Sequence, residues 1–83
     1  MDIEFDAAKD AANQAKHGIS LARAVDLEVV ARVVDGRYAE RRLRAYGLID
    51  GEVYRLAYTL RHGVVRAISL RRAHRKELRR HAP

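Results

Sequence analysis

The sequence predicts a small α+β domain with two short N-terminal helices, an antiparallel β-meander and a short basic C-terminal helix. Three observations support this. Two helix-capping residues, Asp6 and Ser20, each precede a segment with helical spacing. An Asp50-Gly51 pair, which favours a two-residue hairpin turn, separates two segments of alternating polarity. Because 83 residues give room for one modest core, we expect a single domain over residues 1–83.

The N-terminal segment is expected to start with a short edge strand over residues 3–5, where apolar and acidic residues alternate. Asp6 can cap the helix that follows. Residues 7–16 are rich in alanine, the strongest helix former, and Gly18 can end the helix in the left-handed conformation.

A second short helix and a strand are expected next. Ser20 can cap the helix, and its apolar residues are spaced like a buried stripe: Leu21, Ala24, Val25 and Leu27. The strand is expected over residues 28–34 (EVVARVV), which are rich in β-branched side chains.

The turn at Asp50-Gly51 predicts a hairpin of residues 42–49 with 52–61. If Ile49 faces Glu52, apolar and polar side chains separate onto opposite faces. The further pairs in this register are Ala45–Leu56, Leu43–Tyr58, Arg44–Ala57 and Arg42–Thr59.

His62-Gly63 predicts the next turn, which leads into a last strand ending near residue 70. Here the alternation does not decide whether Leu60 pairs with Val64 or Val65. Apolar residues fall on both faces in either register, so we expect this strand to be covered on both sides.

The final helix, expected over residues 73–81, has only Leu78 and flanking alanines to bury. Isolated helices need about 12–15 residues to be even marginally stable. The helix must therefore lean on the sheet, on a partner or on bound nucleic acid.

Charge is distributed unevenly along the chain. Residues 1–40 carry a net charge of −3, and residues 41–83 carry +9, with eleven arginines among twelve basic residues. This asymmetry is typical of a nucleic-acid surface or of a surface that meets an acidic partner. Arginine matches phosphate oxygens with two hydrogen bonds, which favours phosphate recognition.

Other features of the composition argue against disulfide bonds, metal sites, membrane-spanning segments and a signal peptide. The chain has no cysteine, so it has neither disulfides nor thiolate metal sites, and the four histidines lack metal-ligand spacing. No apolar run is long enough to span a membrane, and the acidic start is unlike a signal peptide. We expect a cytoplasmic protein.

The basic side chains and one tyrosine form a candidate RNA-binding set. Tyr46 shares the polar face with Arg44 and can stack on a base, whereas Tyr54 and Tyr58 share the apolar face and are expected in the core. Any single arginine can equally be a solvated strand residue. The RNA-binding candidates are Lys16, Arg42, Arg44, Tyr46, Arg72, Arg75, Lys76, Arg79 and Arg80.

A second set could cleave RNA without a metal ion. Such a reaction uses the 2′-hydroxyl of the substrate as nucleophile, so the protein supplies charge stabilisation and proton transfer. His17 can instead simply complement the helix dipole, and Glu77 with His81 can form an ordinary ion pair on one helix face. The catalytic candidates are His17, Arg61, Arg66, Arg71, Glu77 and His81.

The sequence resembles the BrnT family, toxins of type II toxin–antitoxin systems within the RelE/ParE-like group. The resemblance covers nearly the whole chain in three ordered blocks. These are Phe5-Asp6 with Lys9, Asn13 and Lys16-His17-Gly18-Ile19-Ser20; Glu40 with Arg42, Gly47, Tyr58-Thr59 and Arg61; and Arg66-Ala67-Ile68-Ser69-Leu70-Arg71-Arg72-Ala73 with Glu77.

The chain also departs from the family pattern. His74 replaces a usual Thr, which removes a good helix cap, and His81 falls where Tyr is common. Leu21 replaces an aromatic residue, Val29 an Asp, and the segment between Val34 and Glu40 is short.

The resemblance implies a RelE-like fold and RNA cleavage that arrests translation without a cofactor. It implies a BrnA-like antitoxin as partner, through which the complex contacts operator DNA. A non-catalytic nucleic-acid-binding module and a pure protein-interaction module remain alternatives, and the sequence leaves the oligomeric state open, a homodimer included.

Overall fold

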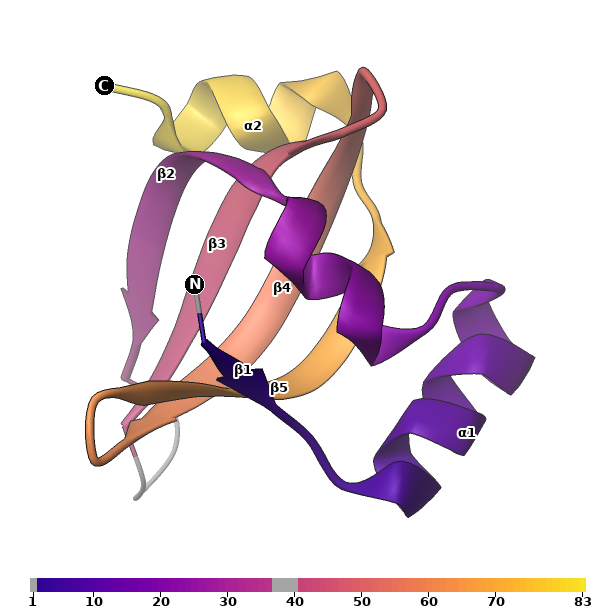
Figure 1. Ribbon diagram of the computed structural model, residues 1–83. Coiled ribbons are helices and arrows are strands. Elements are labelled where there is room, and N and C mark those ends of the chain that lie inside the picture. The colour runs from indigo at the N-terminus through magenta and orange to yellow at the C-terminus, as the bar shows by residue number, and fades with distance from the viewer. Residues whose placement is uncertain (1, 37–40) are drawn as a thin grey trace.

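A computed structural model shows the expected α+β class and describes residues 2–36 and 41–83 (Figure 1). Five strands form one sheet in the order β1-β5-β4-β3-β2. The elements are β1 (Ile3–Glu4), α1 (Ala7–His17), the 3-10 helix η1 (Leu21–Asp26), β2 (Glu28–Asp35), β3 (Arg42–Ile49), β4 (Glu52–Arg61), β5 (Val64–Arg72) and α2 (Arg75–His81). Glu40, part of the resemblance, lies outside the described residues.

The β3–β4 hairpin has the predicted register. Its turn places Asp50 and Gly51 at φ of 51° and 78°, the left-handed values that a tight hairpin turn requires. The pairs Ile49–Glu52, Ala45–Leu56, Leu43–Tyr58 and Arg44–Ala57 are all present. The predicted hairpin is therefore confirmed from the turn as far as Leu43–Tyr58.

The β4–β5 pairing settles the register that the sequence left open, since Leu60 pairs with Val65. Farther along, Ala57 pairs with Ser69 but Tyr58 pairs with Ala67, so β5 carries an extra residue. This bulge reverses the alternation of side chains partway along β5. The bulge explains why apolar residues fall on both faces in the sequence pattern. Both η1 and α1 contact β5.

The edge strand β1 pairs in parallel with β5, through Ile3–Val65 and Glu4–Arg66. The expected meander is thus confirmed for β2 to β5, while β1 makes the whole sheet mixed. This pairing places the first strand of the sequence beside the last strand, at one edge of the sheet (Figure 1).

The main core lies on the face of the sheet that η1 covers. Leu21 and Ala24 of η1 are fully buried against the apolar side chains of β3, β4 and β5. The expected second helix is a 3-10 helix, with Ser20 capping it at the Ala22 amide as predicted. The buried members of this core are Leu21, Ala24, Leu27, Leu43, Ala45, Ile49, Leu56, Tyr58, Ala67 and Leu70.

On the opposite face, which we call the open face, α2 packs at one end of the sheet, on β2 and β3. The ring of His81 stacks on that of Tyr46, with 5.0 Å between ring centres. Tyr46, Val53 and Ala31 are buried there. The prediction that α2 needs support is confirmed, and its support comes from the sheet.

Helix α1 is fixed to β5 through one buried polar side chain. Asn13 donates to the carbonyls of Leu70 and Ile19, both at 2.9 Å, and accepts from the Leu70 amide at 3.0 Å. Its exposed fraction is 5%. Asn13 therefore holds the helix beside the open face.

The strands β2 and β3 approach closely at Gly47. A Cβ atom added there would lie 2.1 Å from the carbonyl oxygen of Glu28. Only glycine fits this position without moving β2.

None of the described helices is long and apolar enough to cross a membrane.

Candidate nucleic-acid interface and catalytic site

The open face of the sheet presents a row of cationic side chains. The pairing places Arg44 beside Ala57 and Ser69, and places Arg55 between Tyr46 and Arg71. These positions alternate with the core residues, so their side chains lie opposite η1. We call this surface the basic face; its members on the strands are Arg42, Arg44, Arg55, Arg61, Arg66 and Arg71.

Three neighbouring hollows mark the basic face, and the bulge residue Ile68 lines all of them. The central hollow, of about 140 Å³, is lined by Asp35, Arg42, Leu43, Arg44, Arg55, Ala57, Ile68 and Ser69. The helix hollow lies against α1 and is lined by Lys9, Ala12, Asn13, Lys16, His17, Ile68 and Ser69. The edge hollow is lined by Lys9, Arg42, Thr59, Arg61, Arg66, Ala67 and Ile68.

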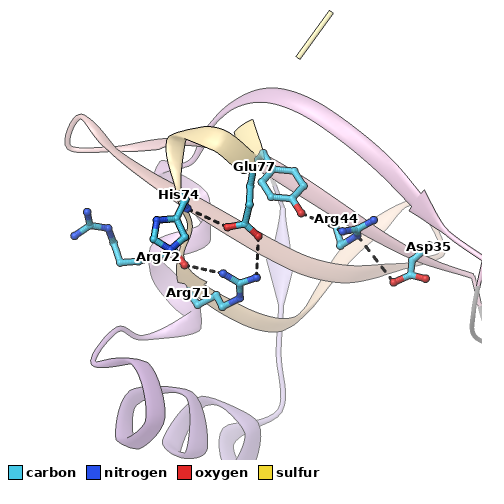
Figure 2. A network of polar contacts seen from close by, with 7 residues as sticks. Asp35, Arg44, Arg71, Arg72, His74 and Glu77 are labelled. Atoms are coloured by element: carbon cyan, nitrogen blue, oxygen red, sulfur yellow. Dashed lines mark hydrogen bonds and ion pairs between the residues drawn. The ribbon is translucent and has the colours of Figure 1, made fainter. Parts of the chain in front are cut away.

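Arg71 and Glu77 form an ion pair between β5 and α2 (Figure 2). Nη2 of Arg71 lies 3.3 Å from Oε1 of Glu77, and Nη1 donates to the Arg72 carbonyl at 2.9 Å. Glu77 also accepts from the His74 amide at 3.0 Å. The backbone N–H of His74 and then the charge of Arg71 lower the pKa of Glu77, so this carboxylate is ionised near neutrality.

These contacts revise two expectations about the last helix. Glu77 faces Arg71 and the start of its own helix, while His81 faces Tyr46, so the suggested Glu77–His81 couple is not formed. The carboxylate of Glu77 accepts from the backbone N–H of His74, the contact that the third residue of a helix makes in a capping box. Glu77 therefore helps to hold the side chain of Arg71 in place.

Arg44 is held by polar contacts on the basic face (Figure 2). Its Nη1 donates to the hydroxyl of Tyr46 at 3.0 Å, and its Nε lies 4.0 Å from Oδ2 of Asp35. Tyr46 has an exposed fraction of 1% and carries the His81 ring on its face. The expectation that Tyr46 stacks on a base is therefore wrong for this arrangement, because His81 occupies that place.

His17 ends α1 and faces the helix hollow beside Lys16. Desolvation lowers the pKa of His17, and the positive charges of Lys16, Arg71 and Arg55 lower it further. The imidazole is therefore neutral at pH 7 and can accept a proton. Because His17 lines the helix hollow together with Ile68 and Ser69 of β5, α1 places it beside the basic face.

Arg61 and Arg66 lie at the far side of the basic face, around the edge hollow. Nη1 of Arg66 lies 3.4 Å from Oε1 of Glu4 on β1. The candidate catalytic arginines are thus spread out: Arg71 lies near α2, and the other two lie towards β1.

Several predicted residues lie elsewhere. Arg72 follows Arg71 on β5 and so points to the other face, where it pairs with Glu52 and lies 5.7 Å from the centre of the Tyr54 ring. Tyr58 is buried in the core as expected, and Tyr54 packs against it. The exposed cations of α2 lie outside the three hollows: Arg75, Lys76, Arg79 and Arg80.

Sequence reasoning missed Lys9 and Arg55 as site residues. Lys9 lines both the helix and edge hollows, and it lies four and seven residues before Asn13 and Lys16 on one helix face. Arg55 lines the central hollow. The predicted hairpin register already places Arg55 opposite Tyr46, so the signal for Arg55 was present.

Two further features complete the surface. In residues 2–36 and 41–83 no group of three His, Asp or Glu side chains is placed to hold a metal ion. The core face carries an apolar hollow of about 220 Å³, lined by Val29, Arg32, Leu43, Ala45, Leu56, Tyr58, Leu60 and Val65.

Comparison with known proteins gives matches of two kinds. Residues 5–77 match the family described as the ribonuclease toxin, BrnT, of type II toxin–antitoxin systems. The fold is similar to the crystal structure of the Brucella abortus ribonuclease toxin BrnT, with a TM-score of 0.69 and 29% sequence identity over 89% of this chain and 97% of that one. No curated protein matches the sequence.

Proposed function

The chain belongs to the BrnT family of ribonuclease toxins of type II toxin–antitoxin systems, and from this premise we propose that it cleaves RNA at the basic face without a metal ion. The observation that carries the proposal is the meeting of a neutral histidine, His17, with the cationic sheet beside Arg71. A proton acceptor and a fixed positive charge are the two elements that cleavage through a 2′-hydroxyl requires.

In the proposed reaction, the 2′-hydroxyl of one nucleotide attacks the adjoining phosphorus. An O2′–P bond forms as the P–O5′ bond breaks, which leaves a 2′,3′-cyclic phosphate and a 5′-hydroxyl. His17 takes the proton of the attacking hydroxyl, and the departing 5′-oxygen takes a proton from water. Holding the phosphate in line with the attack supplies much of the rate enhancement.

Arg71 stabilises the negative charge that develops on the phosphoryl oxygens in the transition state. Glu77 is a positioning residue, because its ion pair directs the Arg71 guanidinium along the sheet. Arg61 and Arg66 of the edge hollow contact the backbone of flanking nucleotides, together with Lys9 and Lys16 of α1.

A toxin of a type II system has an antitoxin protein as partner. We propose that this antitoxin is BrnA-like, that the RelE-like toxin arrests translation in the cytoplasm by cutting RNA, and that it reaches operator DNA only through the antitoxin. The basic face supports neutralisation by a partner that covers it, because a cationic surface attracts acidic side chains.

The test is a cleavage assay with the purified chain and a defined RNA in excess chelator. After the cut site is mapped, a second RNA carries a 2′-deoxynucleotide immediately 5′ of it. We expect chelator-resistant cleavage of the first RNA, a cyclic phosphate on the product, and binding without cleavage of the second RNA.

Each other result has a definite meaning. Activity that chelator removes and a divalent ion restores would contradict the metal-free reaction. Cleavage of the deoxy-substituted RNA would contradict the 2′-hydroxyl as nucleophile. Binding of RNA with no cleavage under any condition would make the chain a binding module. In cells, induction of the chain alone should stop incorporation of labelled amino acids, and a co-expressed antitoxin should restore it.

A further inference from the structure

Arg55 occupies the middle of the basic face. It lies on β4, with Tyr46 opposite on β3 and Arg71 opposite on β5. Directly paired side chains on neighbouring strands have Cβ atoms about 4.5–5.5 Å apart. Arg55 thus faces another guanidinium at the closest approach that a sheet provides, an arrangement that is unfavourable in an unliganded protein.

In the part of the chain that the structure describes, the guanidinium of Arg55 has no direct acidic partner, although Glu77 lies near enough to attract its charge. Its Nε is buried and has no hydrogen-bond partner. Among the described residues no hydrogen bond or ion pair engages the guanidinium, and the Glu77 carboxylate bonds Arg71. Burial lowers the pKa of Arg55, as do the charges of Arg71 and Arg44, yet a guanidinium does not lose its proton in proteins. The cation stays partly buried and unpaired, with its Nε out of contact with solvent.

The central hollow beside Arg55 has the chemistry of an anion site. Arg44 and Arg42 line it together with Arg55, and Ser69 contributes a hydroxyl. Its volume of about 140 Å³ gives room for a tetrahedral oxyanion of the size of phosphate. The acidic lining residue is Asp35, which lies on the Arg44 side.

We propose that the central hollow is a phosphate-binding subsite in which Arg55 is the principal contact, and that it holds a backbone phosphate of the RNA next to the bond being cut. This inference rests on the proposed function, since it assigns the bound group to that substrate. A phosphate oxygen supplies the missing partner of the Arg55 Nε and neutralises the repulsion between Arg55 and Arg71.

Arg55 then has opposite effects on stability and on binding. Without anion, a partly buried and unpaired cation beside a second one destabilises the fold, so Arg55→Met stabilises it or leaves it unchanged. With anion, the same side chain is the reason for affinity. Residues that sacrifice stability for binding have this signature, whereas a structural arginine gives loss of stability on replacement.

The test compares the parent with Arg55→Met and with Arg32→Met. Arg32 is a strand arginine exposed on the core side of the sheet, outside the three hollows of the basic face. Thermal unfolding is followed in inorganic phosphate and in chloride of equal ionic strength. Affinity for the uncleavable 2′-deoxy-substituted RNA is measured for the same three proteins.

In chloride we expect Arg55→Met to unfold at the same temperature as the parent or higher. At ten times its Kd, phosphate should raise the unfolding temperature of the parent and of Arg32→Met by about 5–10 °C. In Arg55→Met this rise should be absent, and RNA affinity should fall by about 10-fold or more. Arg32→Met should bind RNA within a factor of about three of the parent.

A loss of stability in Arg55→Met with an unchanged response to phosphate would overturn the proposal. So would a lost response to phosphate with unchanged RNA affinity, because the site would then take a free anion only. If Arg55→Met fails to fold, Arg55→Lys serves in its place, and the Arg55 Nε–H resonance of the parent must shift on phosphate titration. Arg55-dependent binding in a chain that never cleaves RNA would uphold the subsite and refute only the cleavage.

Discussion

Asn13 pairs with both backbone polar groups of Leu70, 57 residues away, as a neighbouring strand would. The side-chain amide donates to the Leu70 carbonyl and accepts from its N–H, while a further bond to Ile19 fixes the end of α1. All these groups lie in or beside the core. The Asn13–Leu70 hydrogen bonds fix the position of α1 against β5. They therefore also fix where His17 and Lys16 lie relative to the sheet.

Asn13→Ala should destabilise the protein by about 2–4 kcal/mol, because it leaves the buried N–H and carbonyl of Leu70 without partners. Chemical denaturation measures this. The control is Gln14→Ala, whose side chain makes one exposed hydrogen bond to Asp10; it should cost less than about 0.5 kcal/mol. Equal effects of the two changes would show that Asn13 is not the anchor of α1.

Gly47→Ala should also be strongly destabilising, by about 2 kcal/mol or more, because the added methyl group meets the backbone of Glu28. Gly36→Ala is the matched control, since a Cβ at that position has no atom within 4 Å. The unfolding temperatures of the two variants test this. A Gly47→Ala protein as stable as Gly36→Ala would mean that β2 moves away from β3 at little cost.

Arg71→Ala should lower the cleavage rate by about 10²–10³-fold, the usual loss when a contact to the transition state is removed. RNA affinity should fall far less, since several other cations remain on the basic face. Single-turnover rates and binding of uncleavable RNA separate the two effects, with Arg32→Ala as control. Equal losses of rate and affinity would make Arg71 a positioning contact for the RNA backbone.

His17 should give the cleavage rate its pH dependence. The pKa of His17 is lowered from about 6.5, and a base must be unprotonated. The rate should therefore be constant near pH 7 and fall only as the pH drops below 6.5. His17→Ala should be slower and lose this fall. A fall that persists in His17→Ala would assign the titration to another group.

The lowered pKa of His17 also makes the stability of the folded protein depend on pH. Below pH 6.5 the unfolded chain binds a proton at His17 more readily than the folded protein does. Stability should therefore decrease as the pH falls through this range. His17→Gln should lessen the decrease, and equilibrium unfolding between pH 5 and 7 measures it.

Much of the fold follows from local sequence signals. Asp50-Gly51 and the alternation around it give the hairpin register, and the caps at Asp6 and Ser20 give the starts of α1 and η1, because each signal acts within a few residues. The parallel pairing of β1 with β5 and the bulge at Ile68 depend on contacts between distant segments, so no local pattern indicates them.

The site shows the same division. The basic character of the sheet and the presence of His17 at a helix end are local properties. The burial of Tyr46 by His81 and the separation of Arg72 from Arg71 required knowing where α2 packs and which way β5 faces. Arg55 differs from these residues, because the predicted hairpin register was enough to place it on the basic face. It was not among the residues selected from the charge pattern.

The position of β5 between β1 and β4 has a consequence for the protein as it is being made. Synthesis proceeds from the N-terminus, so Ile3, Glu4 and Asn13 emerge from the ribosome long before Val65, Arg66 and Leu70, their partners. The helix that carries His17 cannot dock until those last partners arrive. His17 therefore takes its place beside the basic face only after the last strand of the sheet has been synthesised.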